Sequence, residues 1–264
     1  MKIGIKQKLI ASFMLATIVP LAGVSYYAYK KAQASLEASG IEQVESMRRS
    51  KKAALDTYFK TISNQLAFLS HDDSILDALD EYTAGFASYG KDAHLSSVDV
   101  IAARKRLQDY NKNECGAECA KQNEKKSANE SAPFSRLSEA QVILQSAYIA
   151  DNTNPLGSKH KLDMAEGNTT YNRAHAKYHG KLREYLEKFE YYDIFLIDAE
   201  SGNIVYSVFK ELDFATSLKT GPYADTSLGQ AFRNAVKLPD GDELTMGDYQ
   251  AYYPSYNAPA GFIA

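Results

Sequence analysis

The sequence has little cysteine, no tryptophan and none of the short motifs that mark common enzyme classes. Its 264 residues include two cysteines, Cys115 and Cys119, which are too few for a disulfide scaffold and have no Cys/His cluster with zinc spacing around them. No G-x-S-x-G, P-loop, G-x-G-x-x-G or H-E-x-x-H pattern occurs. We therefore predict a protein that is not an enzyme and that needs no cofactor or metal. The net charge of -3 gives no argument for a nucleic-acid partner.

Charge is also missing from a stretch near the N-terminus. Residues Leu9 to Ala28 include no charged side chain over 20 positions, which is about the length that a bilayer core requires. This pattern predicts a cytoplasmic tail at residues 1–8 and a transmembrane helix at residues 9–29. Lysines precede the stretch, and the positive-inside rule then favours a cytoplasmic N-terminus. These basic residues are Lys2, Lys6 and Lys8.

A cleaved signal peptide is the alternative interpretation of this segment. Ala32-Gln33-Ala34 has the small-x-small form of a cleavage site. The apolar run is longer than a signal peptide needs, and Lys30 and Lys31 separate it from that site, so an uncleaved anchor is favoured. On either interpretation the rest of the chain leaves the cytoplasm. We expect an inner-membrane protein whose main domain lies in the periplasm or outside the cell.

Residues Leu36 to Leu69 are predicted to form one long helix. Apolar side chains recur on a seven-residue repeat, interrupted by Arg48 and Lys51, whose long stems can still cover such a stripe. Two arrangements remain open: the helix lies against its own domain, or it pairs with its twin in a homodimer. The stripe consists of Ile41, Val44, Leu55, Tyr58, Ile62 and Leu69.

Residues 30–190 as a whole are predicted to be the helical part of the exported domain. Within it, residues 71–110 show an amphipathic pattern with a loop near Gly85 to Gly90, and residues 111–133 are a polar insertion without large apolar groups. Cys115 and Cys119 fall in this insertion. In an oxidising compartment they could form a short-loop disulfide, or remain two free thiols. Further helices are predicted at Leu137 to Ile149 and at Tyr171 to Phe189.

The character of the sequence changes at residue 191. Residues 191–264 show short runs of aromatic and β-branched residues, with Ser201-Gly202-Asn203 as a hairpin signal. Helices followed by an antiparallel sheet predict the α+β class. The chain stops inside an apparent strand, so we expect a truncated sheet. The predicted strands are residues 191–198, 204–209, 246–253 and 260–264, with a helix at Thr226 to Val236.

Three histidines are the nearest approach to a metal-binding cluster. His175 and His179 are four residues apart on a predicted helix, which is metal-ligand spacing, and His160 precedes them. No supporting Glu motif accompanies them, so we interpret them as solvated helix histidines. Asp193 and Asp198 are interpreted as residues near the ends of a hairpin.

Several segments together resemble the start of methyl-accepting chemotaxis proteins. The likeness is loose over the N-terminal half and more specific over residues 145–264, which look like the extracytoplasmic Cache-type sensor of such receptors. The segments that carry it are Ile5-Lys6-Gln7-Lys8-Leu9, Asn154-Pro155-Leu156-Gly157, Tyr191-Tyr192-Asp193-Ile194-Phe195-Leu196-Ile197-Asp198, Ile204-Val205-Tyr206-Ser207-Val208-Phe209-Lys210-Glu211, Asp213-Phe214-Ala215-Thr216-Ser217-Leu218, Gly221-Pro222-Tyr223 and Pro254-Ser255-Tyr256-Asn257-Ala258-Pro259.

The resemblance implies a PAS-like sheet flanked by helices, as the first module of a double Cache region. It also implies a second membrane span, a HAMP linker and a cytoplasmic signalling coil, which this sequence does not contain. Histidine kinases and diguanylate cyclases carry similar sensors, so the type of cytoplasmic output domain remains open. The Cache subclass that binds amino acids uses a pattern containing tryptophan, and this chain has none.

The partners expected from this interpretation are a lipid bilayer, a second copy of the chain along the long helix, and a small-molecule ligand. Tyrosine hydroxyls and one carboxylate on or beside the strands could orient a small polar or cationic solute. Each tyrosine could equally be an ordinary packing residue with a solvated tip. A secreted solute-binding protein and a structural coiled-coil adaptor without a ligand are the other classes that stay open. The candidate ligand-binding residues are Tyr192, Tyr206, Asp213, Tyr223, Tyr249 and Tyr253.

Overall fold

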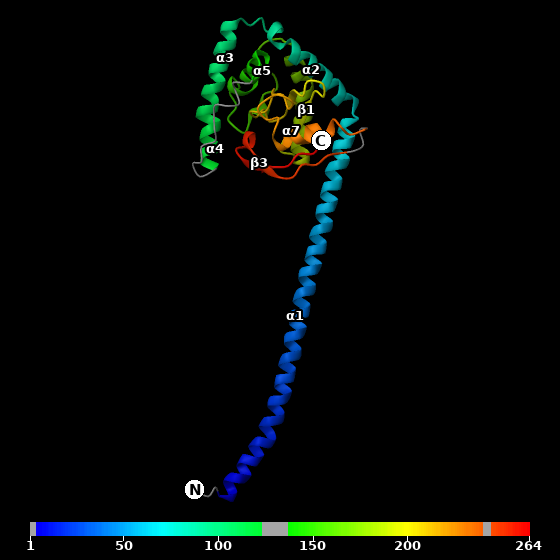
Figure 1. The fold of residues 1–264 in the computed structure, drawn as a ribbon, viewed down its shortest axis with the longest axis vertical. Coiled ribbons are helices and arrows are strands. Elements are labelled where there is room, and N and C mark those ends of the chain that lie inside the picture. The colour runs from blue at the N-terminus through cyan, green and yellow to red at the C-terminus, as the bar shows by residue number, and fades with distance from the viewer. Residues whose placement is uncertain (1–3, 123–136, 240–243) are drawn as a thin grey trace. The chain divides into compact units, whose positions relative to one another are not determined.

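The computed structural model describes residues 4–122, 137–239 and 244–264 (Figure 1). Helices make up most of this part of the chain, and the strands are short. Two compact units are present, Met1–Ile62 and Ser63–Ala264, and each is described by itself. This architecture is compatible with the predicted α+β class.

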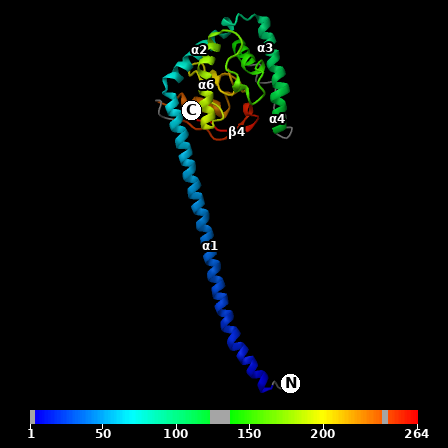
Figure 2. The ribbon, with the colours of Figure 1, turned by 180° about the vertical axis from the view of Figure 1, so that it is seen from behind.

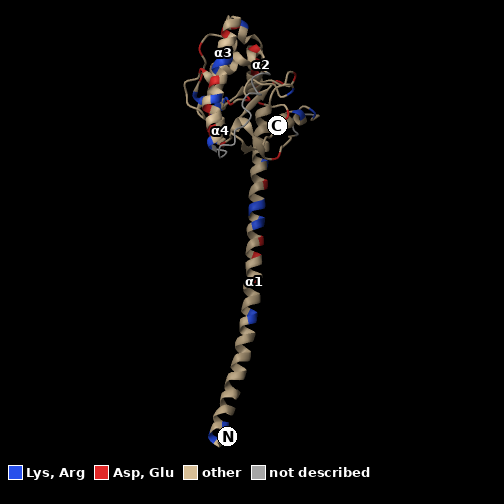
Figure 3. Ribbon diagram, turned by 60° about the vertical axis from the view of Figure 1, so that its left-hand side comes forward, with Lys and Arg blue, Asp and Glu red and all other residues tan. Residues whose placement is uncertain are grey.

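Helix α1 is continuous from Ile5 to Ser70, which confirms the predicted long helix. Its N-terminal stretch has no charged side chain between basic residues at the two ends (Figure 3). Within the described residues, α1 is the one helix long and apolar enough to cross a membrane. The Thr17 hydroxyl donates to the Phe13 carbonyl at 2.9 Å, which satisfies that polar group within the helix itself.

The second unit consists mainly of helices with capped N-termini. Asp72 accepts from the Ser74 backbone N–H at 2.9 Å, and Ser96 and Ser138 each form a reciprocal capping box. These caps explain why the helices begin where they do. The helical segments are α2 (Asp73–Asp92), α3 (Ser97–Tyr110), η1 (Asn111–Cys115), α4 (Gly116–Gln122), α5 (Glu139–Gln145), η3 (Ser146–Ala150), η4 (Lys159–Lys161), α6 (Thr170–Phe189), α7 (Ser227–Ala235) and η5 (Tyr253–Ser255).

The predicted loop near Gly85 to Gly90 is wrong, because α2 runs through both glycines without a break. Helices α2 and α6 lie side by side (Figure 2). A Cβ atom built on Gly85 would lie 2.7 Å from the Cα and the backbone nitrogen of Tyr171 in α6. Gly85 is therefore a close-packing residue of a helix and not a turn residue.

The predicted polar insertion at residues 111–133 is also wrong over its first half. Residues 111–122 are helical, in η1 and α4, because Asn111, Cys115 and Cys119 form a buried face at helical spacing. Both cysteines are free thiols, so the possible disulfide between them is absent. Residues 123–133 of the insertion lie outside the described part of the chain.

Among the described residues, the strands form two separate antiparallel pairs, and not the single PAS-like sheet that the resemblance implies. Strand β1 (Phe195–Ile197) pairs with β2 (Ile204–Ser207), with Leu196 opposite Tyr206. Strand β3 (Gln250–Tyr252) pairs with β4 (Ala258–Ala260). On its other side, β2 bonds to an irregular segment, where the Ile204 N–H donates to the Thr216 carbonyl at 2.9 Å. Backbone that is not a regular strand thus takes the place expected for further strands.

The core is unusually rich in tyrosine. The rings of Tyr82 and Tyr206 are 4.6 Å apart, and Tyr82 and Tyr171 are 5.2 Å apart. Buried hydroxyls find partners across elements: Tyr171 donates to the Val205 carbonyl at 2.7 Å and Tyr148 to the Asn172 side chain at 2.9 Å. These bonds tie α5–η3 and α6 to each other and to β2, and so fix the base of the segment that follows β2.

Candidate functional site

The segment Lys210 to Ala215, which follows β2, contains the buried Lys210 and Asp213. Its two end residues both have left-handed backbone conformations, with φ of 60° at Lys210 and 62° at Ala215. Such conformations are costly for residues other than glycine, asparagine and aspartate, and persist only where the surroundings hold them. Gln145 helps to fix this backbone, because its side-chain amide donates to the Leu212 carbonyl at 2.9 Å and to the Phe214 carbonyl at 2.6 Å.

Asp193 and Lys210 are a buried pair of opposite charge at the start of this segment. One oxygen of Asp193 accepts backbone N–H bonds from Ile194, Val208 and Phe209 at 2.7, 2.8 and 3.1 Å. Burial raises the pKa of Asp193 and lowers the pKa of Lys210. The Lys210 ammonium lies 4.2 Å from the centre of the Tyr206 ring and donates to the Ser207 carbonyl. Asp193 thus organises the backbone, and is more than a residue near a hairpin end.

Glu211 and Asp213 bring two further carboxyl groups to the same segment. Asp213 is fully buried and accepts from the Tyr252 hydroxyl at 2.7 Å, and burial raises its pKa to about 7. Glu211 accepts from the Tyr192 hydroxyl at 2.9 Å and from the Ser255 hydroxyl at 3.2 Å. Burial followed by the neighbouring carboxylates raises its pKa well above the usual range. Low-dielectric surroundings and like charges both favour the neutral acids here.

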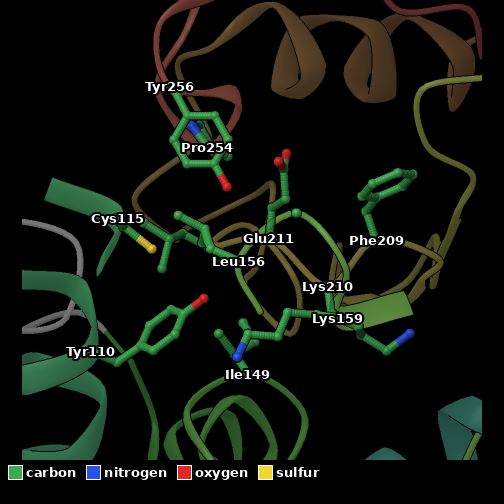
Figure 4. Close-up of a pocket in the computed structure, with 12 residues that line it drawn as sticks. Tyr110, Cys115, Ile149, Leu156, Lys159, Phe209, Lys210, Glu211, Pro254 and Tyr256 are labelled. Atoms are coloured by element: carbon green, nitrogen blue, oxygen red, sulfur yellow. The ribbon is translucent and has the colours of Figure 1, made fainter. Parts of the chain in front are cut away.

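A small cavity lies against this segment. Its walls come from distant parts of the chain: α3 and η1, η3 and the segment between η3 and α6, the residues after β2, and η5 with the residue that follows it. Its volume is about 10 Å³, room for about one water molecule. Figure 4 shows the hydroxyls of Tyr110 and Tyr256 directed from opposite sides into the same space. The other labelled lining residues are Cys115, Ile149, Leu156, Lys159, Phe209, Lys210, Glu211 and Pro254.

The interpretation of His175 and His179 as solvated residues is wrong, because both rings are buried and stacked 4.3 Å apart. His179 Nε2 lies 2.6 Å from the His160 carbonyl, which can only accept, so this nitrogen carries the proton. His179 Nδ1 then accepts from the Tyr206 hydroxyl at 2.8 Å. These bonds attach the segment containing His160 to α6, and burial lowers the pKa of His179 to about 3.

The contribution of His179 to the stability of the chain is expected to fall as the pH drops from about 6.5 towards 3. His179 stays neutral in the folded state but takes up a proton when unfolded, so the unfolded state binds more protons in this range. Each such proton costs about 1.4 kcal/mol per pH unit. The raised pKa of Asp213 acts with the opposite sign, because stability from its neutral form is lost as the pH rises from about 4 to 7.

Urea unfolding at pH 7, 5.5 and 4.5 separates the two effects when wild type is compared with His179→Gln. The variant keeps an N–H donor for the His160 carbonyl and leaves Asp213 unchanged. We expect its stability to fall less steeply with acid, by roughly one proton. His71→Gln, at an exposed histidine, is the matched control and should follow wild type. Equal slopes in wild type and His179→Gln would contradict the assignment.

The structure places four of the six candidate ligand residues around the buried acidic segment. Tyr192 bonds to Glu211, Asp213 bonds to Tyr252, and the Tyr223 ring is 6.2 Å from that of Tyr252. Tyr253 begins η5, whose Ser255 bonds to Glu211. Of the other two, Tyr206 is in the core, where its hydroxyl bonds to His179 and its ring lies 4.2 Å from the Lys210 ammonium. Tyr249 is 65% exposed.

Sequence reasoning missed Glu211, Lys159, Tyr110, Tyr252 and Tyr256. Glu211 could have been found, because it is two positions from Asp213 in the same segment. No local signal marks Lys159 or Tyr110, because both are polar-ended residues whose burial depends on contacts far along the chain. Comparison with family models, with curated proteins and with solved structures found no match to this chain.

Proposed function

We propose that this chain is the extracytoplasmic sensing region of a bacterial transmembrane chemoreceptor. The observation that carries the proposal is α1, one continuous helix that includes both the apolar stretch and, at residues 63–70, the start of the folded unit. A binding event in the folded unit can then act on the membrane segment through a single rigid element. The resemblance of residues 145–264 to Cache-type sensors supports the same function.

The ligand site in this proposal is the cavity beside Lys210 to Ala215. Perturbed titratable groups beside a cavity are common at functional sites. The surrounding segments include the strained Lys210 and Ala215 and the left-handed turn at Tyr256 and Asn257, with φ of 56° and 63°. A ligand that enters this space must displace these walls, because the cavity shown is only about 10 Å³. Such a displacement provides the differential binding that any ligand-driven switch requires.

The proposed signal passes through a homodimer of α1 helices. Within the first unit, the predicted apolar stripe faces outward: Ile41, Val44, Leu55 and Tyr58 are each more than half exposed. A seven-residue repeat of this kind suits pairing with a second helix of the same pattern. Ligand binding would shift or rotate one α1 against its partner by a small step.

Cysteine cross-linking in membranes tests this function. Val44→Cys is expected to give disulfide-linked dimers on mild oxidation, because position 44 lies on the stripe. Ser46→Cys, two positions along and on the opposite face of the repeat, is the matched control and should give few dimers. A metabolite mixture that binds the folded unit should change the yield at Val44. Equal yields at positions 44 and 46, with and without metabolites, would contradict the paired-helix sensor.

A further inference from the structure

Lys159 is a buried lysine without a carboxylate partner among the described residues. Its side chain is in η4, and the residue is only 5% exposed. The ammonium donates to the Asn152 carbonyl at 2.7 Å and lies 4.8 Å from the centre of the Tyr110 ring. The ion pairs of the described part of the chain, which is residues 4–122, 137–239 and 244–264, do not include Lys159. One of its three N–H donors thus binds a backbone carbonyl, and none of them is in an ion pair with a carboxylate of the described residues.

Burial of the Lys159 ammonium in this position is energetically unfavourable. Lysine is almost never fully buried unless it is paired, because removal of its charge from water costs several kcal/mol. The Asn152 carbonyl and the face of the Tyr110 ring offset part of this free-energy cost, but neither has a full negative charge. A bound ligand with a negative charge that contacts the ammonium would balance it.

Lys159 lines the same cavity as Tyr110, Tyr256 and Glu211 (Figure 4). The Tyr110 hydroxyl can donate to an oxygen placed in this space. Glu211 is the carboxyl group in this wall, and burial favours its neutral form, which can also donate. Lys210, the other cation of the wall, is balanced by the buried Asp193. The cavity wall is therefore rich in donors. Its Lys159 ammonium is attracted by the exposed Glu114 but has no ion-pair contact among the described residues.

We propose that this cavity binds a small anion through its carboxylate or phosphate oxygens, with Lys159 as the counter-ion. The inference rests on the proposed function, in that it takes this cavity as the ligand site of the sensor. It differs from the cationic solute that the sequence suggests, because Asp213 is already bonded to Tyr252 and its neighbour Glu211 to Tyr192 and Ser255. Because the cavity shown has room for about one water molecule, the oxygen group of the anion must displace its walls to enter.

Thermal unfolding of the full chain in detergent micelles at pH 7.5 tests this proposal. Sodium acetate and sodium phosphate are compared with sodium chloride at equal ionic strength. An anion that binds the folded state raises the melting temperature with a saturable dose dependence, by roughly 5–10 °C at 100 times its Kd. A shift with acetate alone or with phosphate alone identifies the type of oxygen group that the site accepts.

Three variants locate the effect. Lys159→Met removes the charge but keeps much of the stem, and we expect it to lose at least tenfold in anion affinity. Lys159→Arg keeps the charge and should still bind. Lys161→Met, an exposed lysine in the same short helix, is the matched control and should respond as wild type does. Near-ultraviolet circular dichroism of the buried tyrosines confirms that each variant is folded.

The result that overturns the proposal is the absence of a shift with both anions, or an equal shift in wild type and Lys159→Met. A shift with methylammonium chloride alone would also overturn it, while the sensor function would stand with a cationic ligand. Conversely, anion binding that depends on Lys159 without position-specific cross-linking at Val44 would keep the anion site and reject the paired-helix sensor.

Discussion

Gly85→Ala is expected to destabilise the folded unit by about 1–3 kcal/mol, although alanine is the better helix former. The added Cβ would lie 2.7 Å from the Tyr171 Cα and backbone nitrogen, and 3.0 Å from its Cβ. These atoms belong to the backbone of α6 and the root of a fully buried side chain, so neither can rotate away. The two helices must separate, and this separation opens the aromatic contacts between Tyr82 and Tyr171.

Gly90→Ala is the matched control, since it makes the same change five residues later in the same helix. The nearest atom to its new Cβ would be Ile143 Cδ1 at 3.8 Å, an ordinary contact. Here the gain in helix propensity is unopposed, and we expect stabilisation of up to about 1 kcal/mol. Urea unfolding followed in the near ultraviolet reports mainly the buried tyrosines of the second unit, because the tyrosines of α1 are exposed. Equal stabilities of the two variants would show that α2 and α6 are not packed at Gly85.

Two arginines in the apolar stretch are expected to release the chain from the membrane. Leu15→Arg with Val19→Arg places both charges near the middle of the predicted span. Each arginine costs about 2.5–3.5 kcal/mol at a helix centre during insertion, so the pair costs about 5–7 kcal/mol. The double variant should move from the carbonate-resistant pellet to the supernatant after cell fractionation, as measured by immunoblot.

Ser35→Arg with Ser39→Arg is the control for this experiment. It adds the same charges at the same four-residue spacing, but beyond the apolar stretch. This variant should remain in the pellet with wild type. Retention of the Leu15/Val19 variant in the pellet would contradict a transmembrane anchor, and release of the control would show that charge anywhere on α1 prevents membrane association.

The buried carboxyl groups of this chain are difficult to explain by stability alone. Asp193, Glu211 and Asp213 are all held where burial opposes their charged forms. Apolar residues of similar size would pack there without that cost. The same segment also has two left-handed residues, Lys210 and Ala215. Strain and buried charge in one segment are typical of a binding or switching site, where the cost is retained for function.

The sequence alone determined the features that depend on local pattern. The apolar stretch and the long helix follow from composition and periodicity over many residues, and α1 confirms both as a helix. The predicted helices at Tyr171 to Phe189 and Thr226 to Val236 match α6 and α7 to within one residue at each end. Capping residues such as Thr169 and Thr226 set these boundaries through bonds to neighbours only three positions away.

Only the tertiary structure decided which polar residues are buried and which glycines are turns. Gly85 looks like a loop residue until α6 lies against it, and the histidine pair looks solvated until the His160 segment covers it. The strands after residue 191 shorten because their edges bond to irregular backbone. Lys159 meets Tyr110 through a contact spanning about fifty residues of chain. Local sequence cannot encode such a neighbour, because burial is a property of the packed assembly of segments.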